Sequence, residues 1–241
     1  MKIKEKFIEE HFFRPKWYSI FFNPYFIFRY NLYKNITNFS KEIKLGSKIL
    51  DVGCGIKPYK NLFFDREYLG IDIQGGGHPD KDKIIDKYFD GLNIPYEDNI
   101  FDVVICTEVL EHSLDPEKLI IEMNRVLKNE GTLYLTMPFV WNEHEIPYDF
   151  RRFTSFEHKR ILQKNNFFID SIESINGVFT TSSQLVCAYI FESTKIGGTF
   201  LKFILSIFVF VPIQLFSIIL DKLTRNKWIT LGYVVIAKKK V

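Results

Sequence analysis

The alternation of short apolar runs with helical segments between residues 45 and 137 most constrains the fold of this chain. Five runs have the length and composition of strands, at residues 48–52, 67–73, 83–88, 101–106 and 132–136. Between the last two, apolar residues recur at helical spacing, after Asp115 as a candidate N-cap and Pro116 at the first helical position. Strand–helix alternation of this kind predicts an α/β fold with a mainly parallel sheet.

The rest of the chain adds one helix, two strands and an insertion. Thr154 and Glu157 have the spacing of a capping box, which predicts a helix to about residue 165. Residues 168–175 and 231–237 read as a sixth strand and a last strand. The insertion at 177–228 separates them and contains 18 consecutive uncharged residues, from Phe203 to Leu220.

The glycine turn after the first strand indicates a ligand site. In Ile49-Leu-Asp-Val-Gly-Cys-Gly55, a strand enters two glycines, which let the backbone approach a ligand closely. A dinucleotide fingerprint needs a third glycine where this chain has Pro58, which argues against NAD or FAD. Asp72 ends the second strand, where a carboxylate can accept both hydroxyls of a ribose. The alternatives are an ordinary tight turn and a solvated loop acid.

Four stretches together resemble the type 11 branch of the class I S-adenosylmethionine-dependent methyltransferases. They are ILDVGCG, YLGIDI, FDGLNIPYEDNIFDVVICTEVLEH and DPEKLIIEMNRVLKNEGTLYLTMP, and the resemblance covers about residues 45–175 and the last strand. It implies a Rossmann-like seven-stranded sheet of order 3-2-1-4-5-7-6 with strand 7 antiparallel, the apolar helical insertion lying between strands 6 and 7. Lys57 stands where many members have a third glycine, whereas Pro58-Tyr59 after GCG is common among relatives.

The resemblance also implies S-adenosyl-L-methionine as the cofactor, and it locates the cofactor site. Asp72 is expected on the ribose, and Asp90 near the adenine, with a plain turn acid as the alternative for Asp90. The implied cofactor-binding set is Asp51, Gly53, Cys54, Gly55, Asp72, Ile73, Asp90, Gly91, Thr107 and Glu108.

The loop after the fifth strand is the candidate acceptor site. Ligands of open α/β sheets bind beyond the carboxyl ends of the strands, so this loop should face the methyl donor. We expect His144 as general base and Asp149 as its orienter or an alternative base, unless both only fix the loop. Trp141, Tyr148 and Arg152 are expected to bind the acceptor, with an ion pair to Asp149 or Glu145 as the alternative for Arg152.

This loop also resembles a sub-branch often found with bacterial surface-polysaccharide genes, which shares the pattern W-x-x-H-x-x-P-x-D-x-x-R-[FY]-T. No His, Asp or Cys spacing indicates a metal, so none is expected. His112 is interpreted as a structural cap near the cofactor, and His11, His78 and His158 as surface residues.

The two apolar regions outside the sheet suggest contact with a membrane. Between Phe12 and Tyr33, 11 of 22 residues are aromatic and the charged residues are basic, which is typical of an interfacial segment or of a helical arm packed on its own domain. Residues 198–222 are expected to dock on a membrane without a single crossing, because the flanking strands join one sheet. The alternatives are two crossings with 177–194, a buried cap and a dimer interface.

The expected organisation is a helical arm at 1–44, a methyltransferase core at 45–176, the insertion at 177–228 and a final strand with a basic tail at 229–241. Net charge is +3, which does not indicate nucleic acid as a partner. Glutamates interrupt the apolar N-terminal stretch, so we expect no signal peptide. Three separated cysteines fit a reducing compartment.

The sequence therefore predicts a cytoplasmic methyltransferase, peripheral or monotopic on the inner face of the cell membrane, which O-methylates a small-molecule, glycan or lipid-linked saccharide acceptor. Methylation of an isoprenoid quinone or another lipid is the enzymatic alternative. A catalytically silent membrane scaffold with the cofactor fold is the alternative of another class. The sequence does not specify the oligomeric state.

Overall fold

The computed structural model describes residues 7, 9–75, 80–194 and 204–241, and these form two compact units. One, here called the sheet unit, comprises residues 39–173 and 232–241. The other, the helical unit, comprises the described residues up to 38 together with those of 174–231. The unit boundaries fall at 38/39, 173/174 and 231/232, so the insertion and the described part of the arm up to residue 38 belong to one unit.

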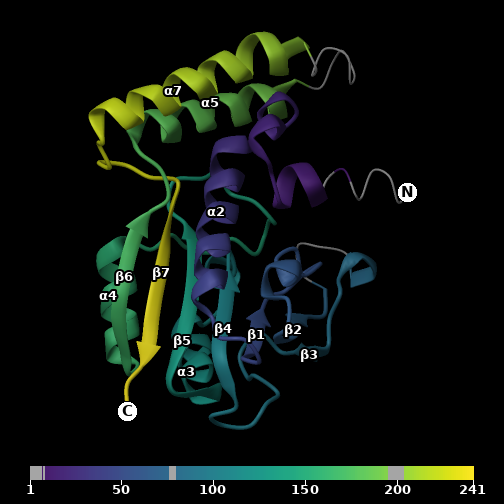
Figure 1. The fold of residues 1–241 in the computed structure, drawn as a ribbon, viewed down its shortest axis with the longest axis vertical. Coiled ribbons are helices and arrows are strands. Elements are labelled where there is room, and N and C mark those ends of the chain that lie inside the picture. Colours follow the sequence, from purple (N-terminus) through teal and green to yellow (C-terminus); the bar gives the residue numbers. More distant parts are fainter. Residues whose placement is uncertain (1–6, 8, 76–79, 195–203) are drawn as a thin grey trace. The chain divides into compact units, whose positions relative to one another are not determined.

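The sheet has seven strands in the order β3-β2-β1-β4-β5-β7-β6 (Figure 1), as the resemblance implies. Strand β7 pairs with β5 antiparallel, and the neighbouring pairs from β3 to β5 are parallel. The strands are β1 (Lys48–Val52), β2 (Glu67–Ile73), β3 (Lys87–Phe89), β4 (Phe101–Thr107), β5 (Leu127–Pro138), β6 (Phe167–Ser174) and β7 (Gly232–Lys239). The third strand is shorter than expected, and the fifth begins earlier, at Leu127, so that Gly131 lies within it.

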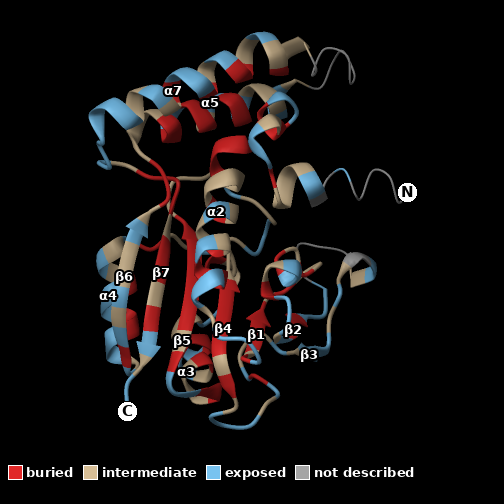
Figure 2. Cartoon of the chain, viewed as in Figure 1, coloured by how far each residue is buried: buried red, intermediate tan, exposed pale blue. Residues whose placement is uncertain are grey.

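Both predicted helix starts in the sheet unit are confirmed. Helix α3 (Pro116–Val126) begins where the Asp115 side chain accepts a hydrogen bond from the Lys118 backbone N–H at 3.0 Å. Helix α4 (Ser155–Lys164) begins where Thr154 Oγ1 accepts from the Glu157 N–H at 3.2 Å. The apolar face of α3 packs with β1, β4 and β5 in one core, so the central strands are buried (Figure 2).

His158 corrects one sequence expectation. It is fully buried instead of lying on the surface, because it faces the core side of α4 together with Ile161 and Leu162. Its ring packs edge-on against Phe153 and Tyr233, with centroid separations of 5.5 and 5.9 Å. Burial lowers the pKa of His158 to about 4, so the ring is neutral at physiological pH.

The helical unit is built around two helices of the insertion that run side by side, α5 (Val178–Ser193) and α7 (Val211–Thr224) (Figure 1). A π-helical turn, Ser206–Phe210, leads directly into α7. The N-terminal residues add a π-helical turn (Glu9–Phe13), a 3-10 turn (Trp17–Phe21) and the first part of α2 (Phe26–Glu42). Ile20, Phe26 and Ile27 of the arm pack with Val211 in a small core.

The helical run Ser206–Thr224 is long and apolar enough to cross a membrane, with 19 residues and a mean hydropathy of 1.8, and only 22% of it is buried. It is the one such run in the described ranges. Pro212 lies in the first turn of α7, where proline is tolerated because the missing N–H needs no partner within the helix. Residues 198–203 of the expected docking segment lie outside the described residues.

Candidate functional site

The turn after β1 requires glycine at its first position. Gly53 has a φ of +72°, and a Cβ there would lie 2.3 Å from Cγ2 of Val109. Gly55 also has a positive φ, of +48°. The backbone N–H groups of Gly53 and Cys54 donate to the Ile71 carbonyl at 2.8 and 3.0 Å, which fixes the turn to β2. The sheet unit therefore presents bare backbone at the carboxyl end of its central strand.

Asp72 connects this turn to the end of β2. Its Oδ2 accepts from the Gly55 N–H at 2.8 Å, and its Oδ1 accepts from the Ile73 N–H at 2.8 Å and from Lys83 Nζ at 3.3 Å. The residue is 9% exposed. Carboxylate oxygens carry further lone pairs, so the predicted acceptance of ribose hydroxyls remains compatible with these bonds.

Lys57, which departs from the family pattern, has a structural role. It adopts the left-handed backbone conformation that glycine favours, with a φ of +53°. Its buried ammonium group pairs with Asp86, which also accepts from the Gly70 N–H at 2.6 Å. Burial alone would raise the pKa of Asp86, but these donors hold it below its usual value. Lys57 thus occupies the position of the family glycine and connects the turn, through Asp86, to Gly70 of β2.

Asp51 lies beneath the glycines and is 2% exposed. Burial raises the pKa of its carboxyl to about 7, although the Tyr68 hydroxyl donates to it at 2.6 Å. Asp51 therefore changes charge near neutral pH, which makes it sensitive to a cation bound nearby.

Asp90 is an exposed residue that stabilises a turn. Its carboxylate accepts from the backbone N–H groups of Leu92 and Asn93 at 2.8 and 2.6 Å and from the Asn93 amide at 2.6 Å. The Asn93 N–H, followed by the other donors, lowers the pKa of Asp90 to about 2. This is the turn acid named as the alternative, and the contact with adenine stays a prediction, as does a role for Gly91.

The loop after β5 brings together three of its expected residues. His144 Nδ1 lies 3.1 Å from Asp149 Oδ2, which also accepts from the His144 backbone N–H at 3.0 Å. Arg152 donates to both oxygens of Asp149, at 2.5 and 2.7 Å, which is the ion pair named as its alternative role. Trp141 is partly exposed and Tyr148 is 47% exposed.

Electrostatics suit His144 to accept a proton. Burial lowers the pKa of His144 more than the Asp149 charge raises it, so the ring is neutral near pH 7. Burial would raise the pKa of Asp149, but the Arg152 guanidinium, with other donors, lowers it to about 2. Asp149 is therefore ionised and holds the imidazole in place.

Glu111 was missed by the sequence analysis. It lies in the 3-10 turn Leu110–His112 after β4, fully buried, and neither carboxylate oxygen has a hydrogen-bond partner within the described part of the chain. Burial, reinforced by the nearby Glu108, raises its pKa well above the usual range. Glu108 has a φ of +55° and its N–H donates to the Thr136 carbonyl at 3.1 Å, which ties the end of β4, after Thr107, to β5.

Glu111, His112 and His144 form a cluster that no sequence spacing indicated. Their ligating atoms lie within 4.8 Å of one another, a geometry that would admit a divalent ion, and the expectation that no metal binds stays a prediction. The two rings meet edge to face at 4.8 Å, and His112 Nδ1 contacts the Tyr148 carbonyl at 2.9 Å. His112 therefore connects the β4 turn to the acceptor loop.

A glycine turn at the end of a buried strand, an acid at the end of the next strand and polar loops beside them are the arrangement of an open α/β domain that binds a nucleoside-containing cofactor. A family model described as a methyltransferase domain matches residues 50–135. An uncharacterized protein of Methanocaldococcus jannaschii is 30% identical over 167 residues, which are 64% of this chain and 71% of that protein. The human mitochondrial ubiquinone biosynthesis O-methyltransferase is 33% identical over 125 residues, 45% of this chain and 33% of its own length.

A solved structure gives the same picture of the fold. The phosphoethanolamine N-methyltransferase 2 of Haemonchus contortus, determined with S-adenosyl-L-methionine, superposes with a TM-score of 0.53 at 19% identity, over 98% of this chain and 59% of that one. Other curated relatives are named as sterol, demethylmenaquinone, tRNA and alkaloid methyltransferases. The chain spans 27–45% of the length of the curated methyltransferases that it matches.

These similarities support a class I S-adenosylmethionine-dependent methyltransferase, whose expected cofactor is S-adenosylmethionine. The residues present fit that cofactor. A Cβ on Gly55 would project into open space, so glycine leaves room there, and Asp72 is held at the end of β2 by two backbone N–H groups. The acceptor is not defined by these similarities, since the relatives act on chemically unrelated molecules.

Proposed function

We propose that this protein O-methylates a hydroxyl group of a glycan or lipid-linked saccharide at the cytoplasmic face of the membrane. The observation that carries the proposal is the His144–Asp149 pair in the loop at the carboxyl edge of the sheet. Methyl transfer from a sulfonium donor needs positioning, and a hydroxyl acceptor additionally needs a base.

In this proposal His144 takes the acceptor proton as the oxygen attacks the methyl carbon. The neutral ring is available because burial lowers its pKa, and its Nδ1 side is occupied by Asp149 and by the Asn142 carbonyl at 3.2 Å, which leaves Nε2 for the acceptor. Arg152 acts through Asp149, whose charge it balances. Trp141 and Tyr148 supply ring surfaces of the kind that pack on sugars.

The membrane part of the proposal is supported by the exposed face of the helical unit. Phe208, Phe216 and Leu223 are 74%, 63% and 74% exposed, on a helical run that carries few charges. Strands β6 and β7, at the two ends of the insertion, are neighbours in one sheet, so a single net crossing is excluded. An interfacial position of α7 satisfies both facts.

An isoprenoid quinone or another lipid is the second candidate acceptor. The same apolar face would suit it, and two groups of relatives are named for ubiquinone and demethylmenaquinone.

The test is donor-dependent labelling of a total membrane extract, with mass analysis of the labelled species. The proposal predicts label in a saccharide that is released from lipid by mild acid, and no label with Asp72→Ala protein. Label in a quinone would favour the second candidate. Label confined to nucleic acid or protein would overturn both.

A further inference from the structure

The helical unit contains a cavity of about 940 Å³, within the size range of small-molecule sites. Its walls come from the arm and α2 between Trp17 and Lys34, from the turn 174–177 with Thr180, and from α7 together with the segment that follows it. None of the residues that form the cofactor site or the acceptor loop lines it. The cavity is therefore separate from the methyl-transfer machinery.

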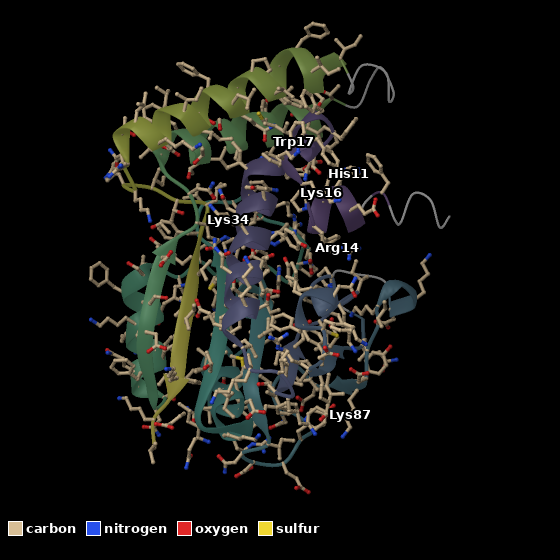
Figure 3. The ribbon with its side chains drawn as sticks, viewed as in Figure 1. His11, Arg14, Lys16, Trp17, Lys34 and Lys87 are labelled. Carbon is tan, nitrogen blue, oxygen red and sulfur yellow. The ribbon has the colours of Figure 1, made fainter. Side chains whose placement is uncertain are left out.

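One wall of the cavity is apolar. Ile20, Phe26 and Ile27 form its buried floor, and Tyr30 and Ile218 pack against them. Trp17, which Figure 3 labels on the arm, is 72% exposed, and Leu215 is 48% exposed. Leu215 continues into the exposed face of α7, so the apolar wall and the predicted membrane-docking face are contiguous along one helix.

The other wall is cationic. It carries Lys34, Lys222, Arg225 and Lys227 against one acid, Asp221. The Asp221 carboxylate is engaged by α5, since it accepts from the backbone N–H groups of Phe179 and Thr180, each at 3.0 Å, and from the Thr180 hydroxyl. None of the four cations forms an ion pair with another described residue.

We propose that this cavity binds an anionic membrane phospholipid, with its phosphate among the four cations and an acyl chain along the apolar wall. Lysine and arginine are the side chains that hold phosphate, and an interfacial tryptophan sits at headgroup depth. Four exposed cations around one engaged acid create a positive potential that favours an anion, and the apolar wall beside them favours an amphiphile over a free ion. The inference rests on the proposed membrane docking and adds a headgroup requirement to it.

The test follows Trp17 fluorescence in a protein that carries Trp141→Phe and Trp228→Phe, so that Trp17 is the one remaining tryptophan. Vesicles of phosphatidylcholine with and without phosphatidylglycerol are compared, each with brominated acyl chains that quench tryptophan at close range. Quenching is expected with phosphatidylglycerol at vesicle concentrations at least tenfold lower than without it.

Two variants that lose the same charge distinguish binding at this site from non-specific electrostatic attraction of the protein to anionic lipid. Lys222→Gln, Arg225→Gln and Lys227→Gln together should abolish the preference for phosphatidylglycerol. Lys159→Gln, Lys238→Gln and Lys240→Gln, exposed residues that remove the same charge from the other unit, should retain it. Undiminished binding of S-adenosylmethionine shows that each variant is folded. Equal losses in both variants, or no quenching of Trp17, would overturn the site.

A monomeric probe distinguishes failure of the site from failure of membrane docking. Dodecyl phosphate below its micellar concentration should quench or shift Trp17 emission in the wild type and not in the cavity variant, and inorganic phosphate should bind at least tenfold more weakly. Binding of dodecyl phosphate without vesicle binding would support the site and contradict the docking. Vesicle binding with no response to headgroup charge or dodecyl phosphate would support the docking and contradict the site.

Discussion

Asp72 combines two tasks at the residue scale, because it fixes the Gly55 N–H and is the predicted ribose acceptor. Asp72→Ala removes two charge-assisted hydrogen bonds to the cofactor, each worth roughly 1.5–3 kcal/mol. We expect S-adenosylmethionine affinity to fall by 100-fold or more in calorimetry. Asp102→Asn is the control, because Asp102 lies at the amino end of β4, away from the carboxyl ends of the strands, and this variant should bind S-adenosylmethionine normally. Undiminished affinity of Asp72→Ala would contradict the assignment.

His144 governs the acceptor step in the proposed mechanism. If His144 is the base, His144→Ala should lower kcat by roughly 100-fold or more, with donor affinity nearly unchanged. Burial lowers the pKa of His144, so the acid limb of kcat/KM should lie below the ordinary histidine value of about 6.5. Asp149→Asn removes the charge that raises this pKa and should move the limb to still lower pH. Parallel loss of donor binding and turnover would make the loop structural instead.

Glu111 makes stability depend on pH. Its pKa is raised in the folded protein, so its favourable contribution is complete below the unfolded pKa of about 4.3 and is lost as pH rises through the folded value. Glu111→Gln removes the ionisation that favours the unfolded chain, and should increase the free energy of unfolding at pH 8 by roughly 1–3 kcal/mol, with less change at pH 5. Urea titrations at both pH values check this. A larger loss at pH 8 than at pH 5 would mean that the ionised form is stabilised.

At the scale of elements, the start of α5 depends on α7. Asp221 caps α5 from the neighbouring helix, and a Cβ on Gly177 would lie 2.6 Å from its carboxylate. Asp221→Ala should cost about 1–2 kcal/mol, as loss of an N-cap does, and speed hydrogen exchange of the Phe179 and Thr180 amides by roughly 5–30-fold. Asp221→Asn keeps an acceptor oxygen and should lie in between. Unchanged exchange at these amides would show that the cap is not formed.

Elements with periodic signals were predictable from the sequence, and isolated buried polar residues were not. The short apolar runs of β1, β2 and β4 and the caps Asp115 and Thr154 lie close to their predicted positions because backbone geometry imposes a local pattern. His158 and Glu111 depend on neighbours from distant segments, which leave no trace in local spacing. Lys57 gave one usable signal, a bulky residue at a position where relatives have glycine.

At the scale of the whole molecule, the proposed membrane docking rests on the exposed helical run Ser206–Thr224. Phe208 is 74% exposed, so Phe208→Lys changes a surface and leaves the core intact. This substitution should shift the protein from the membrane pellet to the supernatant after ultracentrifugation. Deletion of 198–222 with a short linker should have the same effect, while donor binding persists. Ser182→Lys, on exposed α5 surface, is the control. Retention of the Phe208→Lys protein on membranes would contradict interfacial docking by this helix.

The helical unit is formed by two segments that are far apart in the sequence, so the ribosome completes them at different times. Residues 39–173 are translated between those pieces, which at ordinary elongation rates takes on the order of 10 s. During that interval the aromatic arm has left the ribosome without the helices that cover Ile20, Phe26 and Ile27 in the finished protein. The apolar arm of the nascent chain must therefore be kept from aggregating until residues 174–231 have been synthesised. A chaperone or a lipid surface could bind the arm during this interval.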